Sequence, residues 1–264
     1  MYIKPYDELT IQDNFIFQKV MRNKRICKQT IERLLDIDIK DISYPEEEKS
    51  INVRLDSKSI RLDVYVNDDK GTVFNIEMQT TKDMDELVKR TRYYQGLIDI
   101  DNIEKGQNYS ALHDTYIIFI CIFGIFTGKR HKYTFRNLCI EDSEILLNDG
   151  TTKLFLSTKG EADDVSKPLK MFLDYVDGKK PEDALMQEID HEVYTVKHCD
   201  EWRRDYMTLA LEMDKKWREG KAEGKAEGKI EAIRNAIKDG LTTLADVKKS
   251  GRYTEEEIAA IAAP

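Results

Sequence analysis

The sequence predicts an α/β protein in which a helix, three strands, a second helix and a buried strand follow one another, with further helices toward the C-terminus. Three observations carry this prediction. Apolar residues recur with helical spacing over Thr10–Leu35, and apolar and polar residues alternate over 61–67. The run Tyr116–Phe126 (YIIFICIFGIF) is β-branched and aromatic, which is typical of a strand buried on both faces.

The first predicted helix, Thr10–Leu35, begins at a capping signal. Thr10 is expected to be its N-cap, with Asp13 at the third helical position, close to a capping box. Within the helix, the tract Lys19–Arg33 carries six basic residues and the single acid Glu32, a local charge of +5. Such a tract is either a solvated helix face or a contact for phosphates, and its pattern favours neither.

Turns separate the three predicted strands. Ser50–Leu55 and Ser59–Val66 are joined by the turn sequence Asp56-Ser57-Lys58, which is a hairpin signal. A second turn at 67–71 (NDDKG) is rich in residues that tolerate positive φ, and Thr72–Thr80 follows as the third strand. The second predicted helix, Asp85–Glu104, ends near a glycine.

The chain after the buried strand is expected to be mostly helical. Thr127–Leu138 is a second basic stretch, with no acid in it, and Lys153–Leu156 is a short predicted strand. Helices are expected over Lys167–Val176 and over much of Pro181–Arg218.

The segment Glu219–Lys229 reads EGKAEGKAEGK, a four-residue repeat. In a helix, each glutamate of the repeat would lie four residues from another glutamate, and each lysine four residues from another lysine, so like charges would face each other. Each glycine also costs about 1 kcal/mol relative to alanine in a helix. We therefore expect a linker or a weak helix there, between a domain at 1–218 and a small helical tail at 230–264. Three helical pieces are expected in the tail, and it is the candidate surface for a homo-oligomer.

Composition limits the class of protein. The 264 residues include 50 acids and 42 bases, a net charge of −8, and the 41% hydrophobic content excludes wholesale disorder. The four cysteines are far apart in sequence, which excludes a zinc motif and is typical of reduced thiols in the cytoplasm. No apolar run reaches the roughly 20 residues of a membrane-spanning helix, so no membrane partner is expected.

The second predicted hairpin contains the candidate catalytic residues. Arg61, Asp63 and Tyr65 point to one side of their predicted strand, and Glu77 and Gln79 share one face of the next. A turn centred near residue 70 places Asp63 opposite Glu77.

Two opposed carboxylates destabilise a hairpin unless they shift a pKa or recruit a cation. Oxygen ligands favour Mg²⁺, Mn²⁺ or Ca²⁺, and Mg²⁺ on two carboxylates is the usual arrangement for phosphoryl chemistry. The alternative is the solvated face of a two-sided hairpin in which Arg61 balances Asp63.

Several stretches together resemble the Rpn family of recombination-promoting nucleases and putative transposases, within the PD-(D/E)XK nuclease superfamily. They include LTIQDNFIFQKVM, RLDVYVNDDKGTVFNIEMQTT, KRTRYYQGLIDIDNIEKGQNYSAL, YTFRNLCIED and EWRRDYMTLALE, and the similarity runs from about residue 7 to residue 229. The resemblance implies a restriction-endonuclease-like αβββαβ core, with a mixed sheet flanked by helices.

The resemblance also assigns roles to residues. Asp63 and Glu77 match the two acids of the motif and would hold a divalent metal, and Gln79 stands at the lysine position. Where the family has Asp-Asp-Phe, this chain has Asp13-Asn14-Phe15, so Asp13 is the remaining candidate for a further catalytic acid.

These assignments predict a Mg²⁺-dependent DNA endonuclease, with Mn²⁺ or Ca²⁺ as alternative metals. The alternative is a catalytically degenerate nuclease fold that binds DNA or a protein, because Asn14 and Gln79 depart from the motif. Residues of the helix after the hairpin, namely Arg90, Arg92, Tyr94 and Gln95, are weaker site candidates.

Overall fold

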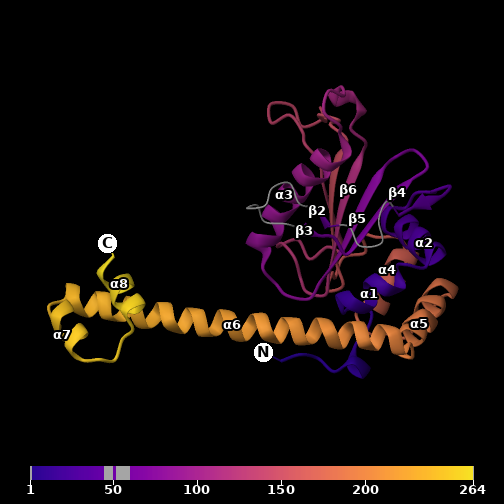
Figure 1. The fold of residues 1–264 in the computed structure, drawn as a ribbon. Coiled ribbons are helices and arrows are strands. Elements are labelled where there is room, and N and C mark those ends of the chain that lie inside the picture. Colours follow the sequence, from indigo (N-terminus) through magenta and orange to yellow (C-terminus); the bar gives the residue numbers. More distant parts are fainter. Residues whose placement is uncertain (1, 45–49, 52–59, 264) are drawn as a thin grey trace. The chain divides into compact units, whose positions relative to one another are not determined.

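The computed structural model describes residues 2–44, 50–51 and 60–263 (Figure 1). The chain forms two compact units. One comprises Pro5–Arg203, and the other comprises Met1–Lys4 with Arg204–Pro264. The division into 1–218, 219–229 and 230–264 stays a prediction.

A six-stranded mixed sheet forms the centre of the Pro5–Arg203 unit, in the order β1-β4-β5-β6-β8-β7. The central strands β5, β6 and β8 are parallel, and the outer pairings are antiparallel. The strands are β1 (Ile42–Ser43), β4 (Val64–Asp68), β5 (Val73–Gln79), β6 (Thr115–Cys121), β7 (Lys132–Phe135) and β8 (Thr151–Ser157). A separate pair joins β2 (Ser50–Ile51) to β3 (Ile60–Arg61).

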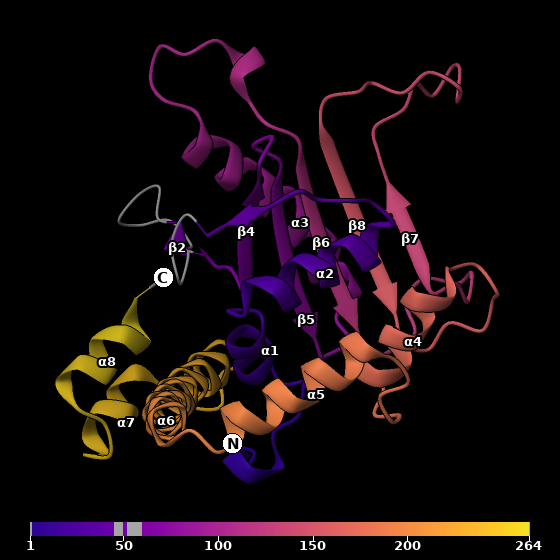
Figure 2. The ribbon, with the colours of Figure 1, turned by 90° about the vertical axis from the view of Figure 1, so that its right-hand side faces the viewer.

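Helices cover both faces of this sheet, which confirms the predicted fold class. Figures 1 and 2 show α3 on one face and α1, α2 and α4 on the other. The helices of this unit are α1 (Asn14–Val20), α2 (Lys24–Leu35), α3 (Met84–Asn102), α4 (Lys167–Val176) and α5 (Ala184–Lys197), with short 3-10 turns at Tyr6–Glu8 and Tyr109–Ala111.

The prediction of one helix over Thr10–Leu35 is wrong, because α1 and α2 are separate. The apolar periodicity continues across the break, but the side chain of Asn23 accepts a hydrogen bond from Ile26 N and caps α2, which starts a new helix there. Thr10 is not the N-cap. Asp13 holds that position in front of α1, and its Oδ2 accepts from Thr10 N at 2.7 Å.

The expected strand Ser59–Val66 is interrupted at Asp63, where the chain passes from β3 to β4. The predicted register is confirmed, since Val64 pairs with Ile76. The turn is centred on residue 70, as expected, and closes with Asp68 N donating to Thr72 O at 3.0 Å. The hairpin turn expected at 56–58 lies outside the described residues.

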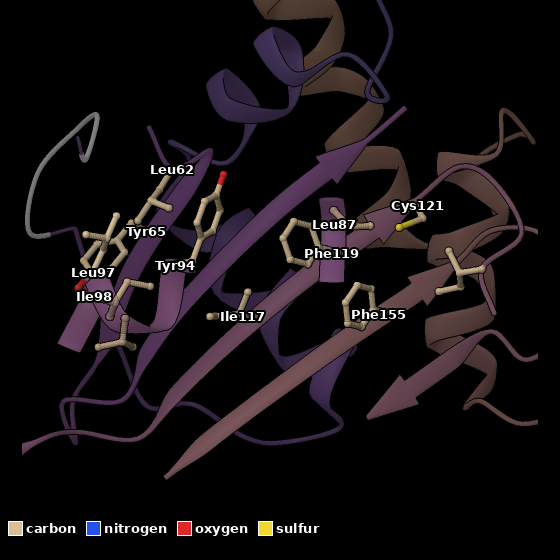
Figure 3. Close-up of a cluster of buried hydrophobic side chains, with 12 residues drawn as sticks. Leu62, Tyr65, Leu87, Tyr94, Leu97, Ile98, Ile117, Phe119, Cys121 and Phe155 are labelled. Atoms are coloured by element: carbon tan, nitrogen blue, oxygen red, sulfur yellow. The ribbon is translucent and has the colours of Figure 1, made fainter. Parts of the chain in front are cut away.

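The predicted buried strand corresponds to β6, in which residues 117–121 are buried. On the α3 side, its side chains belong to an apolar cluster that also includes Tyr65, Tyr94 and Phe155 (Figure 3). Two strands were not expected: β1, and β7 inside the second basic stretch. The short strand expected at 153–156 is longer, as β8. Within the described residues, no helix is both long and apolar enough to cross a membrane.

The repeat 219–229 lies inside one continuous helix, α6 (Asp200–Lys238). The piece expected as a separate helix at 230–238 is the end of α6. Two short helices follow, α7 (Leu244–Lys249) and α8 (Glu255–Ala262), and the expected capping box of Thr254 and Glu257 is confirmed. Lys229 of α6 forms an ion pair with Glu257 of α8 at 3.0 Å, so α8 folds back against α6.

The glycines of the repeat provide a stability test. A methyl group added at Gly220, Gly224 or Gly228 meets no atom within 4 Å. Replacing all three with alanine is therefore expected to stabilise α6, by up to about 1 kcal/mol per site. A thermal melt of the full-length chain, followed by circular dichroism at 222 nm, measures this gain.

The matched control for this test is Gly178→Ala. Gly178 follows α4 with φ +95°, a conformation that alanine adopts only with strain. This variant is expected to melt at a lower temperature than the wild type. A triple variant that also melts earlier would contradict a helical repeat.

Candidate functional site

The hairpin of β4 and β5 brings Asp63 and Glu77 together, as the sequence predicted. Asp63 lies one residue before β4, and its backbone N donates to Glu77 Oε1 at 3.2 Å. In return, Asp63 Oδ2 accepts from Met78 N at 3.2 Å. These two hydrogen bonds replace strand pairing at the bend, so the interruption of the strand is the feature that couples the two acids.

Helix α1 holds the other oxygen of Asp63. Gln18 Nε2 donates to Asp63 Oδ1 at 2.8 Å, and Asn14 Nδ2 makes a long contact of 3.5 Å with the same atom. Gln18 was missed at the sequence level. Its position four residues after Asn14, on the same helical face, is the signal that could have identified it.

Glu77 is a buried carboxyl, with 2% of its surface exposed. Burial raises the pKa of Glu77 well above its ordinary value, and the nearby charge of Asp63 raises it further, whereas Arg90 opposes this. With its amide nitrogen facing Glu77, Asn75 donates to Glu77 Oε1 at 3.3 Å. Glu77 is therefore a carboxyl whose negative charge requires compensation.

Arg90 supplies that compensation from α3. Its Nη2 donates to Glu77 Oε2 at 3.2 Å and to the Tyr94 hydroxyl at 2.7 Å, and its Nη1 donates to Gln79 Oε1 at 3.0 Å. Burial acts to lower the pKa of Arg90, but the hydrogen bond to Tyr94 and the charges of Glu77 and Asp63 outweigh it, so that pKa is raised. A cation thus lies directly beside the motif's glutamine.

The packing of α3 explains why Arg90 reaches the site. Tyr94, Leu97 and Ile98 pack into the apolar cluster on the sheet, which fixes the orientation of the helix (Figure 3). Arg90 lies one turn before Tyr94 and above Phe119 of β6, 5.5 Å from the ring centre. Burial raises the pKa of Tyr94 to about 12, so its hydroxyl stays protonated and accepts from Arg90.

The site is open on one side. Glu77 is buried, whereas Asp63 and Gln79 are half-buried. Oxygen donors from Asp63 and Glu77 suit a hard cation such as Mg²⁺, which keeps several water ligands and does not need a full protein cage. No group of three or more acidic, histidine or cysteine side chains suited to a metal occurs among the described residues.

Asp13 lies at the start of α1, next to Asn14. Its Oδ2 accepts from Thr10 N at 2.7 Å and from Thr10 Oγ1 at 3.3 Å, which ties it to the turn before the helix. Asp13 is the N-cap residue of α1, but its side chain makes no hydrogen bond to the first turn of that helix. Its catalytic role stays a prediction.

Four of the six basic residues of the first basic tract form ion pairs within the protein, and the other two contact an aromatic ring. Lys24 pairs with Asp41 and Lys28 with Glu32. Further pairs join Arg25 to Glu188 and Arg33 to Asp183, and Lys19 and Arg22 lie over the ring of Trp202. These partners favour a structural role for the tract over a contact with phosphates.

A sequence model of PD-(D/E)XK nuclease family transposases matches residues 14–159, more than half of the chain. The chain belongs to this family. The matched region begins at α1, ends just after β8 and includes Asp63, Glu77, Gln79 and Arg90. Membership of the PD-(D/E)XK nuclease family transposases supports a nuclease-like or transposase-like function. No curated protein and no solved structure matches the chain.

Proposed function

We propose that this PD-(D/E)XK family member is a metal-dependent DNA endonuclease that hydrolyses phosphodiester bonds. The observation that carries the proposal is the close approach of Asp63 and Glu77 at the open end of the hairpin, where Asp63 N donates to Glu77 Oε1 and Asp63 Oδ2 accepts from Met78 N. Mg²⁺ is the proposed cation, with Mn²⁺ or Ca²⁺ as alternatives, because both acids offer oxygen donors.

A bound divalent cation would polarise the scissile phosphate and lower the pKa of the attacking water. Asp63 and Glu77 would hold this cation, and Gln18 keeps Asp63 oriented through its hydrogen bond to Oδ1. Gln79 Oε1 is engaged by Arg90, which leaves the amide N–H groups of Gln79 to donate to a phosphate oxygen or to water. Gln79 is uncharged, so the positive charge that stabilises the pentacovalent phosphate comes from Arg90.

Asp13 is retained as a proposed further acid of the site. Cytoplasmic location and a homo-oligomer formed through the C-terminal tail are likewise proposals, and the sequence features given above are their support.

A second candidate function is a catalytically degenerate nuclease fold that binds DNA or a protein. One observation favours it: Arg90 forms an ion pair with Glu77, the acid that a bound metal would otherwise neutralise. Asn14, which stands where the family has a second acid, also favours this alternative.

Nicking of supercoiled plasmid DNA distinguishes the two functions. Wild-type protein is assayed with Mg²⁺, Mn²⁺, Ca²⁺ or EDTA, beside Asp63→Asn and the matched control Asp69→Asn, which changes an exposed acid in the same hairpin. We expect metal-dependent nicking by the wild type and by D69N, and a loss of at least about 10²-fold in D63N.

Equal nicking by wild type and D63N with every metal would overturn the proposed site. DNA binding without nicking under any of these conditions would establish the degenerate alternative.

A further inference from the structure

Four aromatic rings form a continuous cluster next to the candidate site, and we call it the aromatic shelf. Its members are Phe126 after β6, Tyr133 and Phe135 on β7, and Phe155 on β8. Ring centres lie 4.9 Å apart for Phe126 and Tyr133, 5.3 Å for Phe126 and Phe135, and 5.4 Å for Phe126 and Phe155. Phe126 is therefore the centre of the shelf.

Two rings of the shelf are open to solvent. Phe155 is buried, with 3% of its surface exposed, whereas Phe126 is 40% and Phe135 is 43% exposed. Phe126 also has φ +50°, a region that bulky residues rarely occupy. Strained backbone of this kind concentrates at functional sites.

The register of the sheet links the shelf to the candidate site. Glu77 pairs with Phe119 across β5 and β6, Phe119 pairs with Phe155 across β6 and β8, and Phe155 pairs with Tyr133 across β8 and β7. Directly paired residues point to the same face. With strands about 4.8 Å apart, Phe155 lies about 10 Å from Glu77 along one row.

Phe119 lies between Glu77 and Phe155 in this row. It stacks on Phe155 with centres 5.5 Å apart, and Figure 3 shows the two rings on neighbouring strands. The guanidinium of Arg90, which contacts Glu77, lies above the same Phe119 ring. The shelf and the candidate site thus lie on the same face of the sheet, connected by the buried ring of Phe119.

The charges around the shelf match a polyanion. Residues 127–138 contain no acid, and four basic residues accompany Tyr133 and Phe135 in this segment. Within the described part of the chain, Lys129 pairs with Glu161 and the exposed Arg130 has no ion pair, whereas Arg136 lines a pocket with Tyr116 and Thr152 on the other face of the sheet. Exposed aromatic rings beside a basic side chain are the usual elements of a surface for single-stranded nucleic acid.

We propose that the aromatic shelf stacks unpaired bases of DNA whose backbone enters the Asp63–Glu77 site. Single-stranded or locally unpaired DNA is then the substrate class, and this inference rests on the proposed function for its choice of DNA. The spacing of about 10 Å from Glu77 to the buried Phe155 corresponds to roughly three base steps of 3.4 Å, and the exposed rings of Phe126 and Phe135 lie 5.4 and 5.7 Å from Phe155. Bases on the shelf would therefore lie a few nucleotides from the bond that is cleaved.

Binding of a fluorescent base analogue tests the shelf without any cleavage step. A single-stranded oligonucleotide carrying 2-aminopurine, whose emission falls on stacking, is titrated with full-length protein in EDTA, beside a blunt duplex of the same sequence. We expect quenching and tighter binding of the single strand by the wild type. Phe126→Leu is expected to weaken that binding about ten-fold, and Phe126→Tyr to restore it.

Two further variants make the test decisive. Phe135→Leu removes the second exposed ring and replaces F126L if that variant fails to fold. Tyr109→Leu removes an exposed aromatic ring on the loop before β6 and is expected to leave binding unchanged.

Unchanged single-strand binding in F126L and F135L would overturn the inference, as would wild-type preference for the blunt duplex. A wild-type dimer in light scattering that F126L converts to monomers would also overturn it, because a second copy would then cover the shelf. The two proposals fail separately. Stacking without any nicking contradicts the nuclease, whereas metal-dependent nicking without stacking contradicts the shelf.

Discussion

Replacing Glu77 with glutamine is expected to abolish metal-dependent cleavage while making the protein more stable at alkaline pH. Glutamine has almost the same shape but carries no charge, so it cannot act as an anionic metal ligand. It also removes the cost of ionising a buried carboxyl, which is the reason that the pKa of Glu77 is raised.

The pH dependence of this gain has a definite sign. Because the pKa is higher in the folded than in the unfolded chain, the native state binds the proton more tightly. Wild-type stability therefore falls as the pH rises from the ordinary value of 4.5 through the raised folded value. Glu77→Gln does not lose stability in this way. Its gain in stability over the wild type is therefore small near pH 4.5 and is fully present above the folded pKa of Glu77.

Thermal melts at pH 5 and pH 8 measure this effect, and calorimetric titration with Mg²⁺ measures the loss of metal binding. We expect a midpoint at least about 3 °C above wild type at pH 8, and a smaller difference at pH 5. The control Glu104→Gln changes an exposed acid and should leave both midpoints unchanged. A difference that does not grow with pH would contradict a buried, ionisable Glu77.

Replacing Arg90 with methionine is expected to separate metal affinity from turnover. Arg90 and a divalent cation compensate the same carboxylate, so its removal should strengthen Mg²⁺ binding several-fold. The same change removes the positive charge beside Gln79, and cleavage at saturating Mg²⁺ should fall about 10²-fold. Without metal, the midpoint at pH 8 should fall, because Glu77 loses its counter-charge.

Two controls define the role of Arg90. Arg92→Met removes an exposed arginine from the same helix and is expected to change neither property. Arg90→Lys keeps the charge but cannot bind Glu77 and Gln79 at once through a planar guanidinium, so its turnover should be intermediate. Weaker Mg²⁺ binding in R90M would show that Arg90 supports the metal site and does not compete with it.

The acid pair could be predicted because it depends on local rules. Alternation in the strands and the position of the turn determine which residues face each other, and the pairing of Val64 with Ile76 follows from them. The bend at Asp63 could not be predicted in this way. It arises because, in the folded hairpin, Asp63 N donates to Glu77 Oε1 and Asp63 Oδ2 accepts from Met78 N in place of regular strand pairing.

The central role of Arg90 is a tertiary feature. Its spacing from Tyr94 is visible in the sequence, but its contact with Glu77 depends on how α3 packs on β6. The separation of α1 from α2 was missed for a different reason: apolar periodicity continues across the break, while a single side chain, Asn23, caps the second helix. The strand β7 was missed because it is a four-residue segment (KYTF) within a basic stretch and lies half-exposed or exposed at the edge of the sheet.

The internal pairing of the basic tract on α1 and α2 has a consequence for how DNA binding responds to ionic strength. Counterions are released only where free cations meet phosphates, and Arg130, which has no ion pair among the described residues, would release about 0.7 ion per bound single strand. Affinity would then fall only gently as salt rises. Contacts between rings and bases would keep the strand bound under conditions in which a nuclease that relies on lysine–phosphate attraction dissociates.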